Sequence, residues 1–325
     1  MSDERSLTLA QASELAQALA QELRKAVIGQ QEVIDEVLCA LIGAGHVLVE
    51  GVPGLGKTLL VRALSRCFGG EFARIQFTPD LMPSDVTGHA VFDLKSEQFK
   101  LRRGPVFTHL LLADEINRAP AKTQAALLEA MQERQVTLEG RALPLPQPFL
   151  VMATQNPIEQ EGTYPLPEAE LDRFMLKVRI GYPALDEELA MVRKVSASSR
   201  ADMLDVQPLA QLLDAAQVVA LQKVASEMPL ADTVLDYAVR LARATREWPG
   251  LAVGAGPRAS IALVRCARAR ALLRGGEFAT PDDVKASAPA VLRHRVRLAA
   301  ELEIDGLDAD QVLQQLLDQV PAPRN

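Results

Sequence analysis

The feature that most constrains the fold of this 325-residue chain is the glycine-rich segment at 51–58, with the sequence GVPGLGKT. It follows the short apolar run HVLVE at 46–50 and precedes a stretch with helical spacing of apolar residues at 57–68. The pattern GxxxxGK[ST] between a strand and a helix is typical of a phosphate-binding loop (Walker A). Glycines let backbone N–H groups face phosphate oxygens, and the helix N-terminus adds positive potential. An α/β nucleotide-binding domain is therefore predicted.

The residue types in this loop predict a nucleoside triphosphate together with a metal ion. Lys57 can reach the β- and γ-phosphates, and the Thr58 hydroxyl can ligate Mg²⁺. We therefore expect ATP or ADP and Mg²⁺ as cofactors. The residues expected to surround the phosphates are Gly51, Pro53, Gly54, Leu55, Gly56, Lys57, Thr58 and Leu59.

An acidic pair ends the apolar run LLLADE at 110–115. Two carboxylates at a strand end are costly unless they meet cations or water, and this pair follows a phosphate loop along the chain. Asp114 is expected to support Mg²⁺ through a water molecule, as a Walker B residue does. Glu115 is expected to polarise the water that attacks the γ-phosphate.

Short β-rich runs alternate with helical patterns up to about residue 182, which predicts parallel strands in a three-layer α/β core with two inserted β-hairpins. The sequence after 182 is almost entirely helical in pattern. We expect a core domain over 1–182, including N-terminal helices, and an all-α lid domain over 183–325. The expected strands are 46–50, 72–77, 110–113, 149–154 and 174–180, the hairpins 89–103 and 135–145, and the lid helices 186–196, 207–227, 231–246, 258–273, 281–293 and 308–319.

Composition limits the partners. With 35 Lys and Arg against 42 Asp and Glu, the chain is acidic, and aromatic residues make up only 4%. The net charge of −7 gives no global attraction to nucleic acid, so nucleic acid is an unlikely partner. No apolar run has the length of a membrane helix, and the first ten residues lack a signal-peptide pattern. We expect a cytoplasmic protein with no membrane insertion.

A series of longer motifs carries a family resemblance. They are VIGQ at 27–30, the phosphate loop, LLLADEINRAP at 110–120, ALLEAMQER at 126–134, ATQNP at 153–157, LDRF at 171–174 and GPRAS at 256–260. Together they resemble the MoxR family of AAA+ ATPases, in the branch with a β-hairpin inserted into the second core helix. The resemblance extends from about residue 20 to about residue 320.

The resemblance implies roles that spacing alone does not show. Asn156 matches the sensor-1 position, which orients the attacking water, and Arg173 resembles the arginine finger given to the neighbouring subunit's γ-phosphate. Arg258 resembles sensor 2, reaching the nucleotide from the lid. Val27 and Ile28 resemble the segment that touches adenine.

Two further arginines have weaker assignments. Arg118, in EINRAP, is held as a second candidate for an inter-subunit contact. Arg134 is interpreted as a cation at a helix end, where the dipole favours positive charge. The stretch 258–297 is rich in arginine, and we interpret it as a solvated helical face or as a surface that faces the nucleotide or an adjacent subunit.

An arginine finger acting between subunits requires an oligomer, and the resemblance implies a ring, most often of six. It also implies a chaperone-like ATPase that remodels a protein complex, for maturation, activation or metal and cofactor loading, with partners that carry von Willebrand factor A domains. The alternative is a nucleic-acid motor similar to a helicase, since projecting hairpins suit either client. A non-catalytic nucleotide switch is disfavoured because Lys57, Asp114, Glu115, Asn156 and Arg173 are all present.

Overall fold

The computed structural model describes residues 7–52, 54–156, 162–197, 206 and 208–323. At its centre is a five-stranded parallel sheet. The strands lie in the order β2 (Phe72–Gln76), β5 (Leu110–Asp114), β8 (Leu150–Gln155), β1 (Val47–Glu50) and β9 (Leu176–Arg179). The predicted strands and their parallel arrangement are confirmed.

Helices cover both faces of this sheet, as the predicted three-layer core requires. Leu110 and Leu112 of β5 belong to a core that includes the first three helices, α1 (Leu9–Ala26), α2 (Gln31–Ile42) and α3 (Lys57–Phe68). Leu111 and Ala113 belong to the opposite core, with α5 (Ala121–Glu133). Successive side chains of a strand point to opposite faces, so a strand buried on both sides is apolar throughout.

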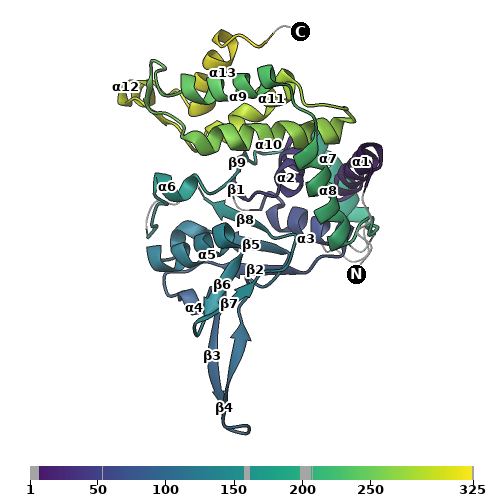
Figure 1. Ribbon diagram of the computed structural model, residues 1–325, viewed down its shortest axis with the longest axis vertical. Coiled ribbons are helices and arrows are strands. Elements are labelled where there is room, and N and C mark those ends of the chain that lie inside the picture. The colour runs from purple at the N-terminus through teal and green to yellow at the C-terminus, as the bar shows by residue number, and fades with distance from the viewer. Residues whose placement is uncertain (1–6, 53, 157–161, 198–205, 207, 324–325) are drawn as a thin grey trace.

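Two hairpins extend from this core. The first, β3 (Gly88–Asp93) with β4 (Gln98–Arg103), follows the short helix α4 (Pro83–Thr87). Figure 1 shows it reaching away from the sheet, at the end of the molecule opposite the helical region. The second pairs β6 (Gln135–Leu138) with β7 (Arg141–Pro144). Its turn residues Glu139 and Gly140 both have positive φ, at 47° and 73°, as a two-residue hairpin turn of type I′ requires.

The described residues after β9 form a helical lid, in which the helices from residue 232 onward lie above the β9 edge of the sheet and the two earlier ones lie beside α1 (Figure 1). The predicted start of its fifth helix is confirmed, because Thr280 and Asp283 form a reciprocal capping box ahead of Pro281. The lid also holds a small pair of strands that the sequence pattern did not reveal. Its elements are α7 (Leu185–Ala197), α8 (Ala215–Glu227), α9 (Asp232–Ala244), β10 (Leu251–Val253), α10 (Pro257–Arg274), α11 (Pro281–Leu292), β11 (Arg297–Leu298), α12 (Ala300–Ile304) and α13 (Ala309–Gln319).

The expected helix at 207–227 begins only at Ala215, so its first part was wrong. Gln207 lies outside the described residues, and residues 208–213 have an irregular conformation, in which Leu212 and Leu213 pack against the end of α3. The N–H groups of Leu212 and Leu213 both donate to the Cys67 carbonyl, at 2.7 and 3.2 Å. A carbonyl at a helix C-terminus lacks an intrahelical partner, so this tertiary pairing satisfies it.

The N-terminal helices do not pack on the sheet alone. Helices α1 and α2 also contact α8 and α10 of the lid, and their apolar side chains share one continuous core with it. The Ser13 hydroxyl of α1 donates to the Leu272 carbonyl of α10 at 2.8 Å. Core and lid are therefore held together by a shared apolar interior. Among the described residues, no helix combines the length and the apolar character needed to cross a bilayer.

Candidate active site

The phosphate loop connects the carboxyl end of β1 to the first turn of α3. Gly54 and Gly56 have φ of 88° and 83°, and a Cβ built on either one would meet no atom within 4 Å. The backbone is left-handed at both glycines and open where a side chain would stand, as suits a loop that wraps around a phosphate. At Gly51 the requirement for glycine is steric, because a Cβ there would lie 2.6 Å from the Ile180 carbonyl oxygen. Pro53 lies outside the described residues.

Lys57, the lysine of the loop, is partly buried at the start of α3. The Lys57 amino group donates to the Gly51 carbonyl. Burial lowers the pKa of Lys57, while the carboxylates of Asp114, Glu115 and Glu50 act in the opposite direction. The Lys57 amino group therefore lies close enough to Asp114 and Glu115 for their charges to act on it. Leu59, the last residue of the predicted loop set, instead packs its side chain partly buried against the core.

Asp114 ends β5 and is buried, with both carboxylate oxygens engaged. Arg74 of β2 approaches Oδ2 with its Nε at 2.7 Å, and the Thr154 hydroxyl donates to Oδ1 at 3.1 Å. These two partners hold the buried carboxylate in one orientation. Neither Arg74 nor Thr154 had been singled out from the sequence.

Glu115 follows in a left-handed conformation, with φ of 56° and ψ of 50°. A residue other than glycine adopts this region only when its surroundings hold it there, and such positions concentrate at functional sites. Its N–H donates to the Thr154 hydroxyl oxygen at 2.9 Å. Its Oε2 accepts from Gln76 Nε2 at 2.7 Å and lies 3.1 Å from Arg118 Nε. Arg118 is therefore part of the site of its own chain.

Asn156 comes directly after β8, which pairs with β1 on one side and with β5 on the other. It is buried, and its place at the carboxyl ends of these strands lies between the phosphate loop and the acidic pair. The fold therefore assembles Lys57, Asp114, Glu115 and Asn156 at one edge of the sheet. In a parallel α/β sheet this is the edge where ligands bind.

The donors near the loop fit magnesium. Thr58 opens α3 beside Lys57 and offers a hydroxyl, and Asp114 offers a buried carboxylate. Mg²⁺ bound with a nucleotide usually takes one or two protein oxygens and completes its shell with phosphates and water. No group of three or more Asp, Glu, His or Cys residues suited to an all-protein metal cage occurs among the described residues.

The segment expected at the adenine end, Val27 and Ile28, forms the connection from α1 to α2. Gln30, two residues further, donates through Nε2 to the Leu55 carbonyl of the phosphate loop at 3.1 Å. Gly29 has φ of 75°, and a Cβ there would lie 2.7 Å from the Glu187 carboxyl group of α7. The segment is thus tied to the phosphate loop and covered by the first lid helix.

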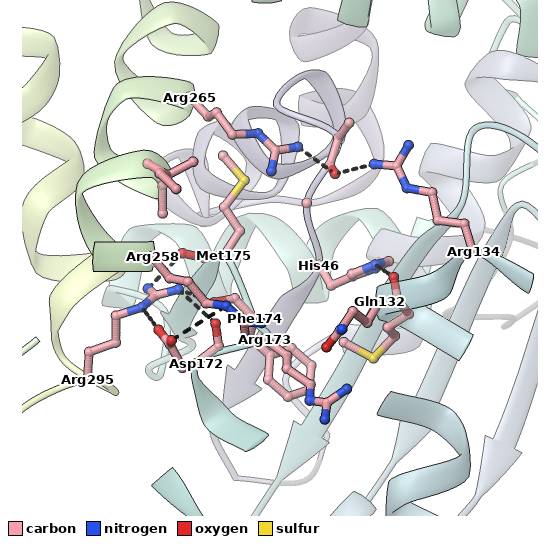
Figure 2. Close-up of a pocket in the computed structure, with 15 residues that line it drawn as sticks. His46, Gln132, Arg134, Asp172, Arg173, Phe174, Met175, Arg258, Arg265 and Arg295 are labelled. Carbon is pink, nitrogen blue, oxygen red and sulfur yellow. Dashed lines mark hydrogen bonds and ion pairs between the residues drawn. The ribbon is translucent and has the colours of Figure 1, made fainter. Parts of the chain in front are cut away.

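A second feature lies at the opposite edge of the sheet, where the chain enters β1 and β9. It is a cavity of about 240 Å³. Among the described residues that line it are five arginines and a single carboxylate, Asp172 (Figure 2). The arginines are Arg134, Arg173, Arg258, Arg265 and Arg295. An excess of positive charge in a confined cavity favours an anionic occupant.

Two of these arginines share one backbone acceptor. Arg134 and Arg265 approach the Ala44 carbonyl from two sides, at 3.2 and 2.8 Å, as Figure 2 shows. The neighbouring His46 adds no charge. Its Nδ1 accepts from the Val151 N–H and its Nε2 lies 3.1 Å from the Met131 carbonyl, a pairing that only the neutral ring satisfies, and burial lowers its pKa to about 4.

Arg173 and Arg258 both line this cavity. Arg173 donates to the Leu128 carbonyl at 3.2 Å and pairs with Glu170 at 3.2 Å. Arg258, half exposed at the start of α10, has its Nε 3.9 Å from Asp172 Oδ2. The phosphate loop of the same chain begins beyond the other end of β1, four residues or roughly 13 Å away. The fold therefore puts Arg258 beside Arg173, at the edge of the sheet opposite the phosphate loop of its own chain.

Comparison with known proteins agrees with this architecture. Residues 46–176 match the family model described as "ATPase family associated with various cellular activities (AAA)", and residues 243–316 match the AAA lid domain. A crystal structure of a proposed ATPase from Cytophaga hutchinsonii superposes with a TM-score of 0.88 at 38% identity, covering 96% of each chain.

Two curated relatives carry the family name. Chaperone MoxR1 of Mycobacterium tuberculosis is 44% identical over 313 residues, covering 93% of this chain and 81% of the relative. Protein MoxR of Methylorubrum extorquens is 31% identical over 323 residues, covering 93% of each. Similarity of this degree over nearly the whole length shows that the chain belongs to the MoxR family of AAA+ ATPases and hydrolyses ATP.

Proposed function

We propose that this ATPase works as a ring in which each ATP is bound between two subunits. One subunit supplies the phosphate loop, and the next supplies Arg173 and Arg258. The observation that carries this proposal is the separation of the two sets of residues onto opposite edges of one sheet. An arginine on the amino edge of a chain can meet a γ-phosphate only if that phosphate belongs to a neighbour.

In this site the protein contributes positioning and charge rather than covalent chemistry. Glu115 polarises the attacking water, and Asn156 orients it. Lys57 contacts the β- and γ-phosphates, while Thr58 and Asp114 would hold Mg²⁺, which when bound neutralises charge on the phosphate oxygens. Arg173 and Arg258 of the next subunit stabilise the charge that develops as the γ-phosphate leaves.

The client is proposed to be a protein, in the chaperone-like role that the name of the Mycobacterium tuberculosis relative carries. The β3–β4 hairpin exposes apolar side chains, with Leu94 84% and Phe99 74% accessible, and Phe92 stacks edge-on against Phe99 at 5.2 Å. Exposed apolar groups of this kind suit a protein surface better than a phosphate backbone.

Several finer assignments belong to the same proposal. We expect six subunits in the ring, a partner with a von Willebrand factor A domain and a cytoplasmic location. We place the boundary between the core and the lid near residue 182. A change in the angle between core and lid during hydrolysis would move the two hairpins against the client.

The shared site is tested by mixing two inactive variants. Glu115→Gln lacks hydrolysis at its own site but keeps its arginines, whereas Arg173→Ala keeps its own site but lacks the finger. Mixed rings contain interfaces that pair an intact site with an intact Arg173, so ATP turnover should return to a fraction of the wild-type rate. Mixtures that stay inactive while forming mixed rings would contradict the shared site.

The client class has its own test. Single-stranded and duplex DNA should leave the ATPase rate unchanged at low salt. Salt-sensitive DNA binding that stimulates turnover would instead favour a nucleic-acid motor.

A further inference from the structure

Three consecutive residues of the lid hold the turn that carries Arg173. They are Arg293, His294 and Arg295, just after α11, and we call them the lid clamp. Arg293 donates to the Lys177 carbonyl at 3.0 Å, and His294 Nε2 lies 3.1 Å from the Phe174 carbonyl. All three residues contact backbone atoms of the core between residues 172 and 177. They therefore attach the lid to the core where the chain enters β9.

Arg295 makes most of these contacts. Its Nε lies 2.6 Å from Asp172 Oδ1, and its Nη2 donates to the carbonyls of Phe174 and Asp172 at 2.6 and 3.3 Å. Its Nη1 donates to the Met175 carbonyl at 3.2 Å and to the Val291 carbonyl. The side chain is only 3% exposed. Its acceptors in the core are on both sides of Arg173.

The same carboxylate connects Arg295 to Arg258. While Asp172 Oδ1 accepts from Arg295, its Oδ2 faces the Arg258 Nε at 3.9 Å (Figure 2). Asp172 therefore lies between a buried arginine and a half-exposed one. Without Arg295, the Asp172 carboxylate and the Met175 carbonyl would lose this donor, and the turn would be held by fewer hydrogen bonds.

We propose that Arg295 is a positioning residue for ATP hydrolysis in the neighbouring subunit. From the lid it fixes the turn that carries Arg173 and, through Asp172, the guanidinium of Arg258. One lid side chain thus sets the geometry of both arginines offered to the next nucleotide. This inference rests on the proposed sharing of the site between subunits.

The test uses two variants of Arg295. Arg295→Met keeps much of the side chain's bulk but removes all its hydrogen bonds. Arg295→Lys keeps the positive charge but loses the planar guanidinium group that donates to several acceptors at once. A small misplacement of a group acting in the transition state costs roughly 10- to 100-fold in rate. We expect such a loss of kcat for Arg295→Met and a smaller loss for Arg295→Lys. Binding of a fluorescent ATP analogue to the variant's own phosphate loop should stay within about twofold of wild type, since Arg295 lies at the other edge of the sheet.

Arg297→Ala is the matched control. Arg297 lies two residues further, is 61% exposed, and pairs with Glu168 at 3.2 Å. Its substitution should leave turnover unchanged, which shows that the loss in the Arg295 variants comes from the clamp and not from removing any arginine of this segment.

Mixing separates positioning from a general loss of structure. Arg295→Met combined with Glu115→Gln should regain turnover, because the Glu115→Gln subunits supply well-placed arginines to intact sites of the Arg295→Met subunits. The inference is overturned if Arg295→Met alone hydrolyses ATP at the wild-type rate. It is also overturned if that variant is not rescued while Arg173→Ala is rescued by the same partner. Failure of both mixtures would instead contradict the shared site itself.

Discussion

The Thr154 hydroxyl donates to Asp114 Oδ1 at 3.1 Å, and the same oxygen accepts the N–H of Glu115 at 2.9 Å. One side chain of β8 thus contacts both residues of the acidic pair at the end of β5, the carboxylate of Asp114 and the backbone of Glu115. This hydrogen bond holds the backbone of Glu115 in its left-handed conformation.

Thr154→Val keeps the shape of the side chain but removes both hydrogen bonds. We expect ATP turnover to fall by about tenfold or more, because Asp114 and Glu115 lose their common anchor, and stability to fall by about 1–3 kcal/mol from the unpaired groups. Nucleotide affinity should change little. The matched control is Thr233→Val, at an exposed position in α9. Wild-type turnover by Thr154→Val would show that the anchor has no catalytic importance.

Experiments should separate the role of Lys57 in ATP binding from the role of Glu115 in ATP hydrolysis. Lys57→Ala removes the cation that meets the β- and γ-phosphates, so it should abolish detectable ATP binding. Glu115→Gln keeps the shape of the site and should bind ATP normally while turnover falls by roughly 10²- to 10⁴-fold. Equilibrium binding and single-turnover hydrolysis measure the two effects. Substantial hydrolysis by Glu115→Gln would exclude Glu115 as the residue that activates water.

Gln30 is the tether between the adenine-end segment and the phosphate loop. Gln30→Ala removes its hydrogen bond to the Leu55 carbonyl. A net loss of about 0.5–1.5 kcal/mol corresponds to roughly a two- to tenfold weaker ATP affinity. Titration with a fluorescent ATP analogue checks this. Gln31→Ala, exposed at the next position, is the control and should bind as wild type does. Equal affinities of the two variants would contradict the tether.

Glu36 of α2 links stability to pH. Burial raises its pKa to about 7, from 4.5 in an exposed chain. The folded protein therefore holds a proton that the unfolded chain releases above pH 4.5, so this group's contribution to stability is lost as pH rises towards 7. The loss is up to about 3 kcal/mol.

In the Glu36→Gln variant, the side chain at this position is neutral at every pH. Relative to wild type, its free energy of unfolding should increase between pH 5 and pH 8, as measured by chemical denaturation at both values. Taking the difference between variant and wild type cancels the opposite pH dependence of His46, whose lowered pKa weakens the fold as pH falls from 6.5 to about 4. Glu14→Gln, at an exposed position of α1, should show no such change between the two pH values.

Much of the core could be predicted because its signals are local. The strand, phosphate loop and helix at 46–68 are contiguous, and each residue type there follows from phosphate chemistry or apolar periodicity. The hairpin turn at Glu139 and Gly140 and the capped start of α11 at Thr280 likewise depend on neighbouring residues. By contrast, residues 208–213 have helical spacing of apolar side chains, but Leu212 and Leu213 donate their N–H groups to α3, which no local pattern reveals.

The nucleotide loop, the acidic pair and the α/β class of the core could be predicted from the sequence, since they depend on neighbouring residues and on strand and helix periodicity. Which side chains share a site depends instead on the tertiary structure. Thr154 reaches Asp114 because β8 pairs with β5, and Arg295 reaches Asp172 because the lid folds back over the start of β9. These contacts join residues about 40 and 120 positions apart, and sheet order and lid packing create them rather than any spacing along the chain.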